Sequence, residues 1–166
     1  MKVFKLIVFF GLIITTTSCG IYSFTGADTG NAKTFQVNFF QNNAELIEPG
    51  LDIDFTNALQ DLVQNQTNLN LVTDSGDLIF EGEITEYRIA PMTATAQNTA
   101  AQNRLTMAVN VRYYNGLDEE KDFEQRFTFF FDYPADVQLS SVKGEAHEVL
   151  FERITQDIFN TSLANW

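Results

Sequence analysis

Apolar and polar residues alternate along several stretches of the chain, which is the pattern of a β-strand with one buried face. In the first stretch, Phe35, Val37 and Phe39 are expected on the buried side. The expected strands are residues 34–39, a short segment at 69–73, and three longer segments at 78–89, 104–113 and 123–132. The last two flank Asn115-Gly116, so we expect them to pair as an antiparallel hairpin.

Two other stretches repeat apolar residues every three or four positions, as amphipathic helices do. The first helix is expected over residues 50–66, where the acidic Asp52 and Asp54 in the first turn favour the helix dipole. The second helix is expected from about Lys143. Its buried side would consist of Ala146, Val149, Leu150, Ile154, Ile158 and Phe159.

The order of these elements predicts an α+β fold in which helices and strands are segregated into layers. The simplest arrangement is a two-layer sandwich, with a mainly antiparallel sheet of about four strands and both helices packed on one face. Gly82 falls on the apolar side of its strand, which indicates close packing or a bulge. The uncharged residues 91–103 are expected to form a long hairpin loop or a flexible strand edge.

The N-terminus has the features of an export signal. Lys2 and Lys5 precede an apolar run at residues 6–14, and this run is too short to span a bilayer. Small residues follow, and they end at Cys19, the only cysteine of the chain. This arrangement resembles the lipobox cut by lipoprotein signal peptidase, although Thr16 stands where a leucine-like residue is preferred.

We therefore expect residues 1–18 to be a lipoprotein signal peptide and Cys19 to be acylated, with palmitate among its acyl chains. The alternative is an incidental cysteine near an ordinary cleavage site. Each buried methylene contributes about 0.8 kcal/mol, so two or three acyl chains would hold the protein on a membrane. Residues 19–33, rich in small and polar residues, are expected to be a lipidated tether, and residues 34–166 a single domain.

Removing the signal peptide leaves 8 basic and 22 acidic residues, because Lys2 and Lys5 are lost from a total of 10 basic residues. Nucleic acid is therefore not expected as a partner. A phosphorylated glycolipid would need a local cluster of cations. Arg104, Arg112 and Arg126 are the candidate ligand-binding residues, since alternation places them on the polar face of adjoining strands.

We favour a structural alternative for these three arginines, which is that they pair with Glu124 and Asp132 on the neighbouring strand. Cross-strand pairs of opposite charge are common in sheets.

Patterns that would indicate catalysis are weak. His147, the only histidine, is expected on a solvated helix face among glutamates, and no local motif accompanies it. Glu81 and Glu83 share one strand face and could imitate the carboxylate pair of a glycoside hydrolase, but a solvated strand face also shows this spacing. We expect no catalytic residue, no metal site and no cofactor, and hence no enzyme.

Several segments taken together resemble a known family. They are the opening Cys19-Gly-Ile-Tyr-Ser-Phe-Thr-Gly26, the stretch from Leu71 to Tyr87 with its core Gly76-Asp-Leu-Ile-Phe-Glu-Gly-Glu-Ile84, the segment Ala100-Ala-Gln-Asn-Arg-Leu105, and the ending from Asp157 to Trp166. The combination resembles the LptE family of lipopolysaccharide-assembly lipoproteins and covers nearly the whole mature chain.

The resemblance implies a lipoprotein of the Gram-negative outer membrane, with two helices packed on a sheet. Such a protein would sit as a plug in the β-barrel LptD, assist assembly of that barrel and help deliver lipopolysaccharide to the outer leaflet. Cys19 maps onto the family as the lipidation site, and direct contact with lipopolysaccharide is left open. Residues 20–26 lack the acidic residues that send some lipoproteins to the cell surface, which favours an anchor on the periplasmic side.

A second interpretation remains open. The chain could be a stand-alone periplasmic lipoprotein that binds a lipid or a peptide between its sheet and its helices.

Overall fold

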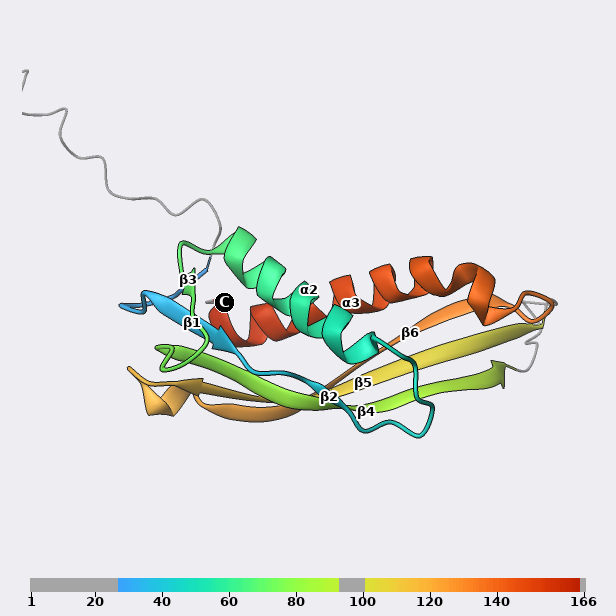
Figure 1. Cartoon of the computed structure of the whole chain (residues 1–166), viewed down its shortest axis with the longest axis horizontal. Coiled ribbons are helices and arrows are strands. Elements are labelled where there is room, and N and C mark those ends of the chain that lie inside the picture. Colours follow the sequence, from blue (N-terminus) through green and yellow to red (C-terminus); the bar gives the residue numbers. More distant parts are fainter. Residues whose placement is uncertain (1–26, 93–100, 165–166) are drawn as a thin grey trace, which may run out of the picture.

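Two helices lie along one face of a curved sheet in the computed structural model of the protein, which describes residues 27–92 and 101–164 (Figure 1). The elements are, in order, β1 (Thr34–Val37), β2 (Gln41–Asn42), α2 (Leu51–Gln66), β3 (Asn70–Leu71), β4 (Leu78–Met92), β5 (Gln102–Asn115), the short 3-10 helix η1 (Glu119–Lys121), β6 (Phe123–Pro134) and α3 (Leu139–Leu163). The predicted α+β sandwich with both helices on one face is confirmed.

The sheet has the strand order β3-β1-β4-β5-β6, and β2 pairs with β4 beside this path. The long strands β4, β5 and β6 pair antiparallel, whereas β1, β2 and β3 make short parallel pairings. The sheet therefore has six strands and not about four. The strands β2 and β3 contain two residues each. The strand expected at residues 69–73 corresponds to β3, whereas β2 is too short for alternation to reveal it.

A bulge in β4 keeps apolar side chains turned toward the helices. The pairing of β4 with β5 shifts between Ile84 and Glu86, so one extra residue is inserted there. Ile84 and Tyr87 are three positions apart, which would place them on opposite faces of a regular strand. Because of the bulge, both are fully buried in the core.

Aromatic rings link the sheet side of the core to both helices. Phe55 of α2 contacts Phe40 and Phe151 edge to face, with ring centroids 5.4 and 5.7 Å apart. The prediction that Phe39 is buried is wrong, since Phe39 is 56% exposed and Phe40 is 0% exposed. The strand β1 ends at Val37, so the alternation of the first stretch does not continue through residue 39.

The first helix agrees with its predicted extent, but α3 begins four residues before the predicted Lys143. The first turn of α3 carries no acidic residue, and Gln138 makes no side-chain capping bond, so the usual start signals are missing. Val149, predicted to be buried, is half-buried. The predicted loop at 91–103 is shorter than expected, because β4 extends to Met92 and β5 starts at Gln102.

Candidate functional site

The face of the long strands that points away from the helices carries the predicted arginines. Strand pairing places the same-face side chains of β4, β5 and β6 opposite one another. We call this surface the open face. Its charged and larger polar or aromatic members are Glu81, Glu83, Glu86, Arg88, Arg104, Thr106, Asn110, Arg112, Tyr114, Glu124, Arg126, Thr128, Phe130 and Asp132.

Arg104 makes the pair expected from the sequence. Its Nε and Nη2 each donate to one carboxylate oxygen of Asp132, both at 2.8 Å. This hydrogen bonding holds the pKa of Asp132 below its usual value. The guanidinium carbon also lies 3.5 Å from the centre of the Phe130 ring, a cation–π contact. The side chain of Arg104 is therefore fixed from two directions.

Arg112 has a different partner from the one expected. Its Nε donates to Glu81 at 3.0 Å and its Nη1 lies 4.0 Å from Glu83, while Asn110 Nδ2 donates to Glu124 at 3.4 Å. The hydrogen bond to Glu81 raises the pKa of Arg112. Glu81 and Glu83 thus face one guanidinium, which gives this carboxylate pair a structural partner.

Arg126 contacts Glu86, and Arg88 contacts the same carboxylate at 3.0 Å. Each of the three predicted arginines therefore has an acidic partner. Arg104 and Arg112 are eight residues apart on β5, about 27 Å at 3.4 Å per residue, so the three do not converge on one point. A ligand-binding role for them stays a prediction.

His147 makes contacts with the core that were not expected from the sequence. The Tyr87 hydroxyl and His147 Nε2 are hydrogen-bonded at 2.9 Å, and the imidazole stacks on Phe151 with ring centroids 5.3 Å apart. Burial lowers the pKa of His147 and raises that of Tyr87. The expectation of a solvated histidine is wrong. Its spacing of three and seven residues from the predicted core residues Leu150 and Ile154 could have indicated this placement.

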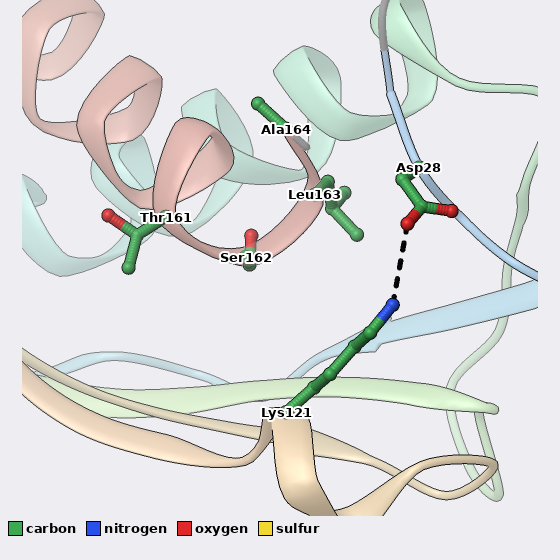
Figure 2. Close-up of a pocket in the computed structure, with 6 residues that line it drawn as sticks. All are labelled: Asp28, Lys121, Thr161, Ser162, Leu163 and Ala164. Atoms are coloured by element: carbon green, nitrogen blue, oxygen red, sulfur yellow. Dashed lines mark hydrogen bonds and ion pairs between the residues drawn. The ribbon is translucent and has the colours of Figure 1, made fainter. Parts of the chain in front are cut away.

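The N-terminal end of the described chain is fastened to the end of α3 (Figure 2). Ala27 forms an antiparallel bridge with Ala164, and the amide of Asp28 donates to the carbonyl of Leu163 at 2.5 Å. Lys121 Nζ lies 3.4 Å from the Asp28 carboxylate across a cavity of about 220 Å³. Part of the expected tether therefore lies against the domain. Cys19 lies outside the described residues.

Residues 27–92 and 101–164 offer neither a metal site nor a membrane-spanning helix. These residues contain no group of three or more histidine, cysteine or acidic side chains placed to hold a metal ion. Within the same part of the chain, neither helix combines the length and the apolar character that crossing a bilayer requires.

Comparison with known proteins identifies a family and a fold. A family model described as LptE, lipopolysaccharide-assembly, matches residues 32–162. A hypothetical protein from Chlamydia trachomatis is 12% identical, with a TM-score of 0.54 over 81% of this chain and 99% of that one. A minor lipoprotein from Acinetobacter baumannii is 11% identical, with a TM-score of 0.51 over 78% of this chain and 91% of that one. The search of curated proteins gave no match. At these identities the two structures show a shared fold.

Proposed function

The chain belongs to the LptE family of lipopolysaccharide-assembly proteins, and from this premise we propose that it is the lipid-anchored plug of an LptD-type outer-membrane barrel. In this role it assists assembly of the barrel and supports delivery of lipopolysaccharide to the outer leaflet. The observation that carries the proposal is the family match over residues 32–162, which spans every helix and strand of the described fold except the last residue of α3.

The proposed anchor is Cys19, acylated after removal of residues 1–18 and held at the periplasmic side of the outer membrane. Support comes from the sequence around Cys19 and from the position of Ala27. Ala27 lies only eight residues after Cys19 and is paired with Ala164 at the end of α3. Eight extended residues reach at most about 29 Å. A lipid anchor at Cys19 would therefore keep the end of the domain that carries Ala27 close to the membrane.

The proposed function is not enzymatic. The LptE family acts in lipopolysaccharide assembly, and the polar residues singled out from the sequence have structural partners. Glu81 and Glu83 face Arg112, and His147 links Tyr87 to Phe151. Replacing His147, the only histidine, by glutamine is expected to leave barrel association intact.

The stand-alone lipid-binding alternative has less support. The space between sheet and helices is filled by large side chains, with Phe55, Phe80 and Leu150 fully buried. A hollow of about 280 Å³ lies between β6 and α3, lined by Phe129, Val149 and three polar residues. This volume lies just below the range of about 300–1,000 Å³ that is usual for pockets holding a small molecule.

Co-purification from detergent-solubilised outer membranes tests the proposal. An affinity tag after Trp166 on the full chain is expected to recover an LptD-type barrel in a one-to-one ratio. A Cys19→Ala variant serves as the control for the anchor, and it should appear in the soluble fraction with no attached acyl chain. Recovery of the wild-type protein as a monomer that carries lipid, with no barrel, would favour the lipid-binding alternative.

A further inference from the structure

We infer that the open face is the surface that docks against the inner wall of the partner barrel, while the helix layer faces the rest of the lumen. This inference rests on the proposed function, because it assigns an orientation to the plug within its barrel. The occupant that we assign to the open face is a polar β-sheet wall. Lumen-facing side chains of outer-membrane barrels are polar, so the inner wall of such a barrel fits a polar surface.

The distribution of charge sets the open face apart from the rest of the molecule. The mature chain carries 22 acidic and 8 basic side chains. The open face holds five of the acidic and four of the basic side chains. The open face thus has a net charge of −1, and the helices and the two ends of the molecule share the remaining −13. Only the open face can approach an uncharged polar wall without bringing a large excess of one charge with it.

The cations and the aromatic rings on the open face are of the types found at interfaces. All four of its cations are arginines, whereas three of the four cations elsewhere in the mature chain are lysines. Arginine and aromatic residues are enriched at protein interfaces and lysine is depleted. Two aromatic rings, Phe130 and Tyr114, are 42% and 40% exposed on this face. A surface that served only for solubility would not require this bias.

The arginines of the open face are already held in place before a partner arrives. Arg104 is fixed by Asp132 and Phe130, and Arg112 by Glu81. A further chain of hydrogen bonds runs from Gln36 to Asn38 and on to Glu81, at 2.6 and 3.2 Å. Ordering a long side chain on binding costs about 0.5–1.5 kcal/mol, and this cost is reduced when the side chain is already fixed.

The size and curvature of the open face also suit a barrel wall. Strands of 12 to 15 residues, spaced about 4.8 Å apart, give a surface of roughly 40 by 14 Å before side-chain relief is added. This area is on the order of the 800 Å² per partner found in stable complexes. The long strands bend around the helices, so the open face is the convex side of the sheet (Figure 1). A convex surface fits the concave inside of a barrel.

Site-specific photo-crosslinking in intact outer membranes tests the orientation. Benzoylphenylalanine would replace Thr106 or Thr128 on the open face, and Asp61 or Glu148 on the exposed side of the helices. The full-length protein is expected to crosslink to the barrel from Thr106 and Thr128 and to give about tenfold less product from the two helix positions. Equal yields from both layers, or stronger yields from the helices, would overturn the inference.

A matched pair of charge reversals gives an independent readout. Arg126→Glu places a second carboxylate beside Glu86 on the open face, whereas Arg153→Glu makes the same change on α3, next to Asp157. Both arginines are half exposed or more, so similar and small losses of stability are expected from the broken ion pairs. Arg126→Glu should lower the recovery of barrel about tenfold, and Arg153→Glu should leave it unchanged.

The outcomes separate this inference from the proposed function. If the wild-type protein recovers no barrel, the proposed function and the orientation both fail. If the barrel is recovered but Arg153→Glu is the damaging variant, the orientation alone is wrong. Crosslinks from Thr106 and Thr128 to a second copy of this chain would also overturn the orientation, because the open face would then be a homodimer interface.

Discussion

His147 joins α3 to the sheet through a hydrogen bond to Tyr87 and a ring stack on Phe151. Burial lowers its pKa more than the negative charge of Glu48 raises it, and the nearby Lys143 lowers it further. The folded protein therefore favours the neutral imidazole, which can share one proton with the Tyr87 hydroxyl. Protonation below neutral pH works against this contact.

The free energy of unfolding is expected to decrease as the pH falls from 7 toward 5. The unfolded chain binds the His147 proton near pH 6.5, whereas the folded protein binds it only at lower pH, so acid favours the unfolded state within that window. One proton limits the slope to about 1.4 kcal/mol per pH unit. Urea denaturation of the wild type and of His147→Gln at several pH values measures this effect.

The His147→Gln variant should lack the extra pH dependence, so that its difference from the wild type shrinks as the pH falls. The carboxylates of Asp77 and Asp132 do not interfere, because their pKa values are lowered from 3.8 and they titrate below this window. A difference between the two proteins that stays constant from pH 7 to pH 5 would contradict the assignment.

Single residues were predictable from the sequence where a strict period applied. Alternation placed Arg104, Arg112 and Arg126 on one polar face, and it also predicted the partner of Arg104. It failed for the partner of Arg112, because a residue in a central strand has neighbours on two sides and alternation alone does not choose between them. Arg112 takes Glu81 on β4 and not Glu124 on β6.

At the level of elements, two glycines show why β4 and α3 tolerate different changes. A Cβ built on Gly82 would collide with the backbone carbonyl oxygen of Asn110 on β5, and it would lie 2.7 Å from the ring of Phe40. The close approach that the sequence indicated at Gly82 is thus confirmed. Gly144 lies within α3, and a Cβ there would have no atom within 4 Å.

Gly82→Ala and Gly144→Ala are therefore expected to change stability in opposite directions. Gly82→Ala must push β4 away from β5, and we expect a loss of about 3 kcal/mol or more. Gly144→Ala should stabilise the protein by roughly 0.5–1 kcal/mol, because alanine reduces the entropy lost when the helix forms. Thermal and urea unfolding of the two variants measure both effects. A neutral or stabilising Gly82→Ala would show that the strands can separate at no cost.

Elements with strong periodic patterns were predicted from the sequence, and those held by tertiary contacts were not. The periodicity of α2 and of the long strands was clear, and their extents agree closely with the structure. The strand β2 exists only because Gln41 and Asn42 lie beside Glu83 and Ile84 of β4. The early start of α3 likewise has no local signal. The helix packs on β6, and Lys143 near its start forms an ion pair with Glu48.

At the level of the whole molecule, the contacts of Ala27 determine which end of the domain is nearest to Cys19. Ala27 and Asp28 are fastened to the end of α3, and Lys121 of η1 contacts Asp28 (Figure 2). The opposite end of the molecule, where β6 ends at Pro134, is 12 residues of β6 away, about 40 Å. The two ends should therefore differ in their distance from a membrane that holds Cys19.

Fluorescence quenching in vesicles can measure this orientation. The proposed acylation of Cys19 would consume its thiol, so Leu117→Cys near η1 or Asp136→Cys after β6 would each provide a single site for a dye. With nitroxide-labelled lipid headgroups in the vesicles, the dye at position 117 is expected to be quenched strongly. The dye at position 136 should be quenched weakly, because the tether reaches at most about 29 Å and the domain adds about 40 Å more. Equal quenching at both positions would mean that the domain lies flat on the bilayer, and that the pairing of Ala27 with Ala164 does not set its orientation.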